Sequence, residues 1–173
     1  MSDNTRDIEI REWFKDIEIH DLFDHESDYA KEHTFDAITD ERIARAEKYI
    51  GYKLPESYVA LLKVQNGGVI NDKYDNSWLS VIYGIGENSN TYNGLEDMFD
   101  NWKEWEYPDI GIPFGETQSA GHDMYYMDYS VVDKNGEPRI VLIDNEMGNE
   151  ITFVADNFED FIRIIIKNEN PFE

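Results

Sequence analysis

The stretch GYKLPESYVALLKVQNGG, residues 51–68, decides how this chain folds. The glycine at its start can close one helix in the left-handed conformation, and Pro55 suits the first position of the next helix, where an N–H would lack a partner anyway. That second helix has an apolar face and ends at a run of asparagine and glycine. Backbone geometry explains each residue type, so we interpret one set as a structural motif that needs no ligand: Gly51, Leu54, Pro55, Tyr58, Asn66, Gly67 and Gly68.

The helix before this stretch is predicted to begin at Thr39, whose hydroxyl can cap the first free amides. Two acidic residues follow in the first turn, where the helix dipole favours negative charge. The apolar face of this helix consists of Ile43, Ala46 and Ile50. Further upstream, helical spacing predicts an amphipathic helix carrying Ile10, Trp13, Phe14 and Ile17.

Beyond residue 68 the pattern becomes typical of strands. Residues 78–83 are rich in strand formers, and residues 125–131 alternate at strand spacing. The turn signal at residues 133–136 predicts a hairpin, whose return strand is apolar at residues 140–143, as expected when both faces are covered. A last helix should begin after Asn157 and bury Phe158, Phe161, Ile162 and Ile165. The pattern predicts a single α+β domain with a mostly antiparallel central sheet and helices packed against it at both chain ends.

The order of Thr39, Glu47, Gly51, Leu54-Pro55, Tyr58 and Asn66-Gly67-Gly68 resembles the signature of the SUKH superfamily. Further matches follow in the expected order at residues 112–115, 121–123, 127–128, 140–143 and 153–155, and then in the last helix. The resemblance covers residues 37–167. We therefore expect an N-terminal helical extension, residues 1–36, and a SUKH-like α+β domain, residues 37–173. The superfamily contains the yeast cell-wall-assembly regulator and many bacterial immunity proteins.

Composition limits the classes of partner. The chain has 38 acidic and 15 basic residues and a formal net charge of −23, so we expect neither nucleic acid nor an anionic membrane as a partner. Cysteine is absent, which excludes disulfides and thiolate metal sites. No apolar run approaches the roughly 20 residues of a membrane helix, and the first residues do not resemble a signal peptide. These features predict a cytoplasmic protein.

The acidic residues are unevenly distributed. Residues 37–86 contain 6 acidic and 6 basic residues, whereas residues 87–128 contain 10 acidic residues and 1 basic residue. We interpret this contrast as an acidic face that speeds the encounter with a basic protein partner. The alternative is an ordinary acidic chain whose charges serve solubility.

Residues 93–107 are the candidate partner-binding segment. Asn93 can cap a helix whose core stripe would consist of Leu95, Met98, Phe99, Trp102 and Trp105. We predict a docking surface for lysine and arginine, with Trp105 or Tyr107 as an aromatic anchor. Its residues are Glu96, Asp97, Asp100, Glu104, Trp105, Glu106 and Asp109. The alternative is a solvated helix face without a partner.

Catalytic and metal-binding patterns are weak in this sequence. The best catalytic fragment is Gly121-His122-Asp123, but adjacent side chains on an extended segment point apart, and neither a cysteine nor a Gly-x-Ser-x-Gly motif is present. Gly84 and Gly86 lack the rest of a dinucleotide-binding pattern. His20, His25 and His33 are not spaced as ligands on one helix face, so we expect no metal and no cofactor.

These features favour binding over catalysis. Together with the resemblance, they imply an immunity protein that neutralises the toxin domain of a bacterial polymorphic or contact-dependent system. A basic nuclease is the expected toxin, because nucleases bind phosphates through basic surfaces. The alternatives are a non-enzymatic interaction scaffold or regulator of the same superfamily and a carboxylate-dependent hydrolase. The oligomeric state stays open.

Overall fold

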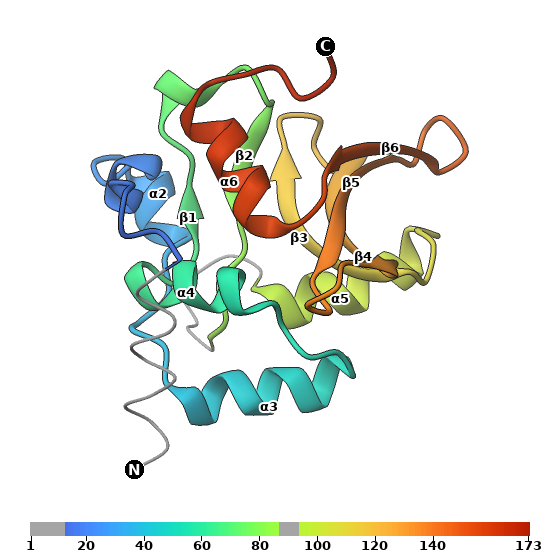
Figure 1. Ribbon diagram of the computed structural model, residues 1–173, viewed down its shortest axis with the longest axis horizontal. Coiled ribbons are helices and arrows are strands. Elements are labelled where there is room, and N and C mark those ends of the chain that lie inside the picture. Colours follow the sequence, from blue (N-terminus) through green and yellow to red (C-terminus); the bar gives the residue numbers. More distant parts are fainter. Residues whose placement is uncertain (1–12, 87–93) are drawn as a thin grey trace.

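A six-stranded sheet organises the fold in the computed structural model, which describes residues 13–86 and 94–173 (Figure 1). The strands are β1 (Gly68–Val69), β2 (Leu79–Ile82), β3 (Gly111–Thr117), β4 (Asp123–Val132), β5 (Pro138–Asp144) and β6 (Glu150–Ala155). They lie in the sheet in chain order, and each pairs antiparallel with its neighbours. The expected α+β fold with an antiparallel sheet is confirmed.

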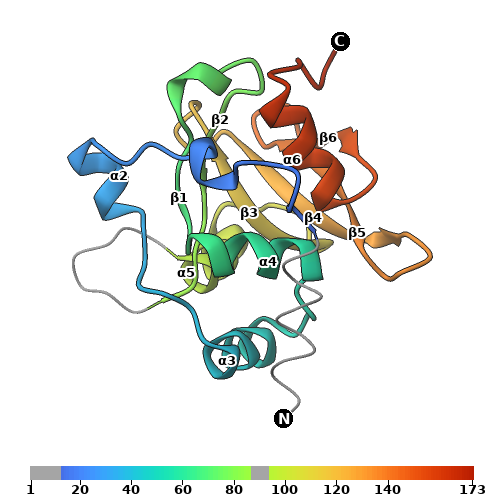
Figure 2. The same cartoon turned by 60° about the vertical axis from the view of Figure 1, so that its left-hand side comes forward.

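The described helices surround this sheet. They are η1 (Ile19–Leu22), α2 (Asp28–Glu32), α3 (Asp40–Ile50), α4 (Glu56–Val64), η2 (Asp72–Tyr74), α5 (Leu95–Glu104) and α6 (Phe158–Ile166). In both ribbon views α4 lies between α3 and α6 (Figure 2). None of the helices in the described segments has the length and apolar character needed to cross a bilayer.

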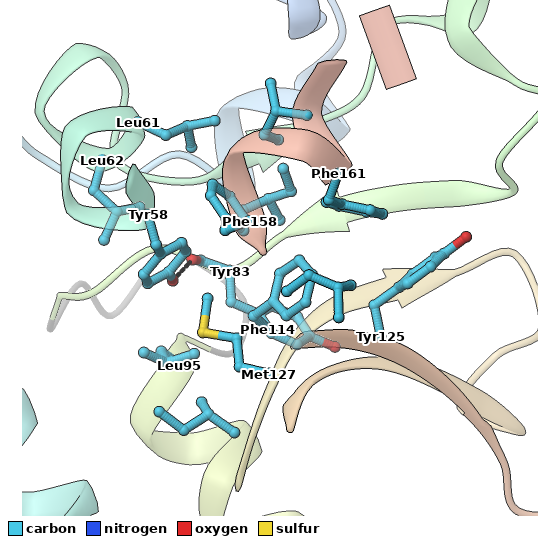
Figure 3. Packing of buried hydrophobic residues seen from close by; sticks show 14 of the residues in the cluster. Tyr58, Leu61, Leu62, Tyr83, Leu95, Phe114, Tyr125, Met127, Phe158 and Phe161 are labelled. Carbon is cyan, nitrogen blue, oxygen red and sulfur yellow. Dashed lines mark hydrogen bonds between the residues drawn. The ribbon is translucent and has the colours of Figure 1, made fainter. Parts of the chain in front are cut away.

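Aromatic side chains fill the core on one face of the sheet. Phe158 and Phe161 of α6 pack against Phe114 of β3, with ring centroids 5.5 and 5.4 Å apart, and Tyr58 of α4 packs against Phe158 at 5.3 Å (Figure 3). The Tyr58 hydroxyl donates a hydrogen bond to the carbonyl oxygen of Tyr83, so this buried polar group is satisfied. The motif residue Tyr58 therefore joins α4 to both the sheet and α6.

The central strands are covered on both faces. Neighbouring residues of a strand point to opposite faces. Tyr125 of β4 contacts Phe161 of α6, with centroids 5.0 Å apart, whereas Tyr126 stacks on Tyr107 beyond α5, with centroids 5.6 Å apart. Residues 124–128 are accordingly all buried, and the strand alternation seen in the sequence carries no solvent-exposed face there.

Most predicted helix ends are confirmed. The Thr39 hydroxyl accepts a hydrogen bond from the Arg42 amide, Gly51 closes α3 with a φ of 86°, and Asn157 caps α6. Pro55 differs slightly, because α4 begins at Glu56 and Pro55 occupies the cap position with an extended ψ of 141°.

The Asn66-Gly67-Gly68 run does more than end α4. Asn66 is buried, and its amide nitrogen donates to the carbonyl oxygens of Asp36 and Ile85 at 2.8 and 2.7 Å. Its amide oxygen accepts from the Ile85 N–H at 2.8 Å. Gly67 has a φ of 80°, and an added Cβ would lie 2.4 Å from the amide nitrogen of Gly84. The run therefore fastens the end of α4 to the segment after β2.

The predicted N-terminal helix is wrong for its described part. Ile10 lies outside the described residues, and residues 13–17 form turns. The Ile17 amide donates to the Phe14 carbonyl oxygen at 3.1 Å, three residues back, as in a turn. The guanidinium of Arg163 in α6 also holds this segment, because it donates to the Trp13 carbonyl oxygen at 3.4 Å and to the Asp16 carboxylate at 2.9 Å. Residues 13–36 still contribute buried hydrophobic side chains: Phe14, Ile19, Leu22, Phe23 and Phe35. The division of the chain at residue 36 stays a prediction.

Candidate functional site

The candidate site is built on α5, which is held against β3 and α3. Leu95, Met98 and Phe99 are buried, as predicted. Gly94 occupies the cap position of the helix, and the Leu95 amide donates to the carbonyl oxygen of Gly84 at 2.8 Å. The predicted cap, Asn93, lies outside the described residues. Packing of the apolar stripe therefore fixes which side of α5 faces outward.

Two carboxylates of α5, those of Glu96 and Asp100, contact side chains of α3. Glu96 forms an ion pair with Arg42 of α3, and both side chains are largely buried. Asp100 accepts a hydrogen bond from the Tyr49 hydroxyl of α3, and this contact raises the pKa of Tyr49. Asp97 and Glu104 are exposed without a role of this kind in the packing of α3 on α5. Glu96 therefore serves the fold as well as the predicted surface.

The segment after α5 presents one of the two predicted aromatic anchors. α5 ends at Glu104, and the chain turns at Glu106, where φ is 59°. This turn leaves Trp105 40% exposed and places Tyr107 in the core, where its hydroxyl donates to the Gly121 carbonyl oxygen at 2.8 Å. The prediction that Trp105 belongs to the core stripe is wrong, and so is Tyr107 as an alternative anchor.

Two asparagines attach this segment to the turn between β5 and β6. The side-chain amide of Asn145 donates to the Trp105 carbonyl oxygen at 2.9 Å, and that of Asn149 donates to the Glu106 carbonyl oxygen at 2.8 Å. The two asparagine side chains also bond to each other at 3.0 Å. The residues at the end of the predicted docking surface thus adjoin one end of β6, which sequence periodicity alone did not indicate.

In the candidate catalytic fragment Gly121-His122-Asp123, the side chains of His122 and Asp123 contact different neighbours. His122 points to Glu146, with Nδ1 2.8 Å from Oε1, and both side chains are exposed. Asp123 instead accepts hydrogen bonds from the hydroxyl groups of Thr117 and Ser119. The two adjacent side chains diverge, as expected, and Asp123 organises the turn between β3 and β4.

One buried carboxylate outside the predicted site is shifted in pKa. Glu137, beside a cavity of 320 Å³ at the start of α4, is 7% exposed, and burial raises its pKa. Nearby donors oppose that shift: Glu137 accepts a hydrogen bond from the Ser57 hydroxyl at 3.0 Å, and the backbone amides of Ser57 and Glu56 also lower its pKa. These donors are the first groups of α4, so Glu137 acts as a helix cap supplied by the neighbouring hairpin.

The histidines of the N-terminal segment do not gather around a common point. His20 and His25 stack with ring centroids 3.9 Å apart, and the His33 ring instead bonds to the Tyr29 carbonyl oxygen at 2.8 Å. Within the ranges that the structure describes, no group of three or more histidine and carboxylate residues is placed to hold a metal ion.

Comparison with known proteins identifies the family. The model of the SMI1 / KNR4 family (SUKH-1) matches residues 37–164. No curated protein matches the chain significantly. The match spans the segment from just before α3 to α6 and includes the Gly51–Gly68 motif, the whole sheet and α5. This chain therefore belongs to the SMI1/KNR4 (SUKH-1) family.

Proposed function

We propose that this protein is an immunity protein that binds a basic toxin domain through the acidic surface on and after α5. The family membership supports a role in binding other proteins. The observation that carries the proposal is a set of exposed carboxylates at residues 94–109, a range that contains one basic residue: Asp97, Asp100, Glu104, Glu106 and Asp109. The basic residue, Lys103, lies over the rings of Trp102 and Phe99 at 5.6 and 6.0 Å.

The mechanism would be occupancy. A nuclease binds its phosphates through a basic surface, and an acidic surface is complementary to the same side chains. Asp97, Asp100 and Glu104 would attract lysine and arginine at long range, and the exposed ring of Trp105 would supply apolar contact at the edge. Binding there would exclude the substrate without chemistry by the inhibitor.

The immunity function predicts a toxin domain encoded next to this gene, and the test uses that domain. Co-expression should restore growth, and the association rate should fall by at least about tenfold as NaCl is raised from about 20 to about 500 mM. At low salt, the double substitution Asp97→Lys with Glu104→Lys should slow association relative to the unaltered protein. A salt-independent association rate would reject steering by charge, and failure to protect growth would reject the immunity function.

Asp75→Lys is a matched control for a single charge reversal. Asp75 is exposed, and it lies in the loop between β1 and β2, away from α5 (Figure 1). It should change the association rate less than Asp97→Lys does, because the two variants alter the net charge equally but only one alters the proposed surface. Equal effects would mean that net charge, and not this surface, governs association.

A further inference from the structure

The outer side of β6 is an open sheet edge. β6 is the last strand of the sheet, and within the described ranges no strand pairs with it on the side away from β5. Figure 1 shows β6 at the opposite end of the sheet from β1. Residues 150–153 are exposed, whereas Val154 and Ala155 are buried. The open part of the edge is therefore the first four residues of β6.

The hydrogen-bonding pattern shows which backbone groups face outward. The backbone N–H of Asn145 donates to the carbonyl oxygen of His122, just before β4, so Asn145 faces β4. In an antiparallel ladder, successive residues of a strand face its two neighbours alternately. Asp144 and Leu142 therefore face β6, where their partners are Glu150 and Thr152. It follows that the N–H and C=O groups of Ile151 and Phe153 point away from β5, toward the open edge.

The side chains at this edge suit strand pairing. Ile151 and Phe153 are 43% and 51% exposed and lie on the same face of the strand. Natural edge strands are usually protected by lysine, proline or a bulge. Residues 140–162 contain neither lysine nor proline, and the irregularity in the β5–β6 pairing lies between Ile140 and Val141, beyond the open part.

Charge indicates what kind of strand could pair there. Residues 144–156, which are the open part of β6 and the segments beside it, contain four acidic residues and no basic residue. The turn that begins β6 is also bonded to Trp105 and Glu106, next to further carboxylates at Glu104 and Asp109. A second copy of this chain would bring like charges together across the edge. An approaching segment with lysine or arginine would be attracted.

We propose that β6 accepts an extended, positively charged segment of a partner protein as an additional strand. The backbone of Ile151 and Phe153 would form the new ladder, and their side chains would contact the apolar residues of the incoming strand. The inference rests on the proposed function for the identity of the partner, because it describes how the toxin domain would be held beside the α5 surface.

A synthetic peptide of alternating lysine and valine tests the edge directly. We expect it to bind the whole protein, and the amides of Ile151 and Phe153 should gain protection from hydrogen exchange, while those of Glu150 and Thr152 are protected already. Two derivatives, N-methylated at the valines or at the lysines, keep the charge but block one edge of the peptide each. One derivative should lose binding. Equal affinity for all three peptides would overturn the proposal.

Substitutions in β6 separate backbone pairing from side-chain contact. Ile151→Pro removes an outward N–H that no ladder bond uses and should weaken peptide binding about tenfold, whereas Ile151→Thr keeps the N–H and should weaken it less. Phe153→Lys should weaken binding more than Phe153→Gln, because the added charge repels the peptide. If Ile151→Pro lowers the unfolding midpoint, the hydrogen-exchange measurement on the unaltered protein replaces this variant as the test of backbone pairing.

The outcomes also distinguish this inference from the proposed function. If the neighbouring toxin is bound and neutralised equally well by Ile151→Pro and the unaltered protein, the edge-strand inference fails and the immunity function stands. If the toxin is not bound while the peptide is, the immunity function fails and the edge still accepts a basic strand. Absence of peptide binding, or a dimer in sedimentation that Ile151→Pro dissociates, would overturn the inference.

Discussion

Glu137 shows how one side chain can serve a helix that is distant in sequence. α4 has no side-chain cap of its own, because its cap position is Pro55, and Glu137 from the β4–β5 hairpin supplies the missing acceptor. Glu137→Ala should lower the free energy of unfolding by about 1–2 kcal/mol, as does loss of other helix caps. Denaturant titration measures the change. A loss below about 0.5 kcal/mol would contradict the capping role.

The pH dependence of Glu137 is a separate prediction. Its folded-state pKa is raised by burial, so the stability that it contributes is full below the pKa of the unfolded chain and declines as pH rises through the folded-state value. Glu137→Gln keeps an acceptor without the charge. The variant should gain stability relative to the unaltered protein as pH rises from about 4 to about 7. A difference that stays constant across this range would show that Glu137 does not titrate there.

Among the motif residues, Asn66 is the one whose substitution should remove the most hydrogen bonds. It bonds to three backbone groups, which are the carbonyl oxygen of Asp36 and the buried carbonyl oxygen and N–H of Ile85. Asn66→Asp keeps the shape but removes both donors and places a carboxylate against two carbonyl oxygens, so we expect a loss of about 2–4 kcal/mol in unfolding free energy. Asn71→Asp is a matched control, since its side chain is an acceptor for the Lys73 amide and should tolerate the change. Equal losses would contradict this account.

Among the elements, the N-terminal segment departs most from its sequence pattern. Phe23 is 1% exposed, forms an isolated bridge with Ile70, and packs so close to Gly68 that a Cβ there would lie 2.7 Å from its ring. Phe23→Ala should therefore cost about 3–5 kcal/mol. Tyr29→Ala, at an exposed position of α2, should cost less than about 1 kcal/mol. Thermal unfolding of both variants tests whether residues 13–36 belong to the cooperative unit, and a small loss for Phe23→Ala would place them outside it.

Sequence predicted elements best where capping and burial agree. For α6, the cap Asn157 and the buried set of Phe158, Phe161, Ile162 and Ile165 are all confirmed, because one strongly amphipathic face meets one core. For α5, the predicted apolar stripe extends one turn too far, to Trp105, because periodicity does not show where a left-handed residue such as Glu106 redirects the chain. Periodicity also does not predict the contact between the end of α5 and the β5–β6 turn, because this contact depends on two asparagine side chains.

At the scale of the molecule, the sequence predicted the sheet and the acidic segment, but it did not predict the burial or the ion pairing of individual residues. Local alternation identified β4, but burial of residues 124–128 on both faces depends on α6 and Tyr107, which lie far away in sequence. Charge counts identified the acidic segment, yet they did not indicate that Arg42 ties Glu96 to α3. Residues that form ion pairs within the protein should therefore be removed from a candidate surface before that surface is assigned to a partner.

The net charge of −23 predicts opposite salt effects on folding and on binding. Carboxylates that repel one another destabilise the compact state, and screening relieves this repulsion, so the melting temperature should rise by several degrees between about 20 and about 500 mM NaCl. Attraction to a basic partner weakens over the same range. Calorimetry of the protein alone and association kinetics with the partner would separate the two effects. A melting temperature that falls with salt would mean that ion pairs such as Arg163 with Asp16 outweigh the repulsion among the surplus carboxylates.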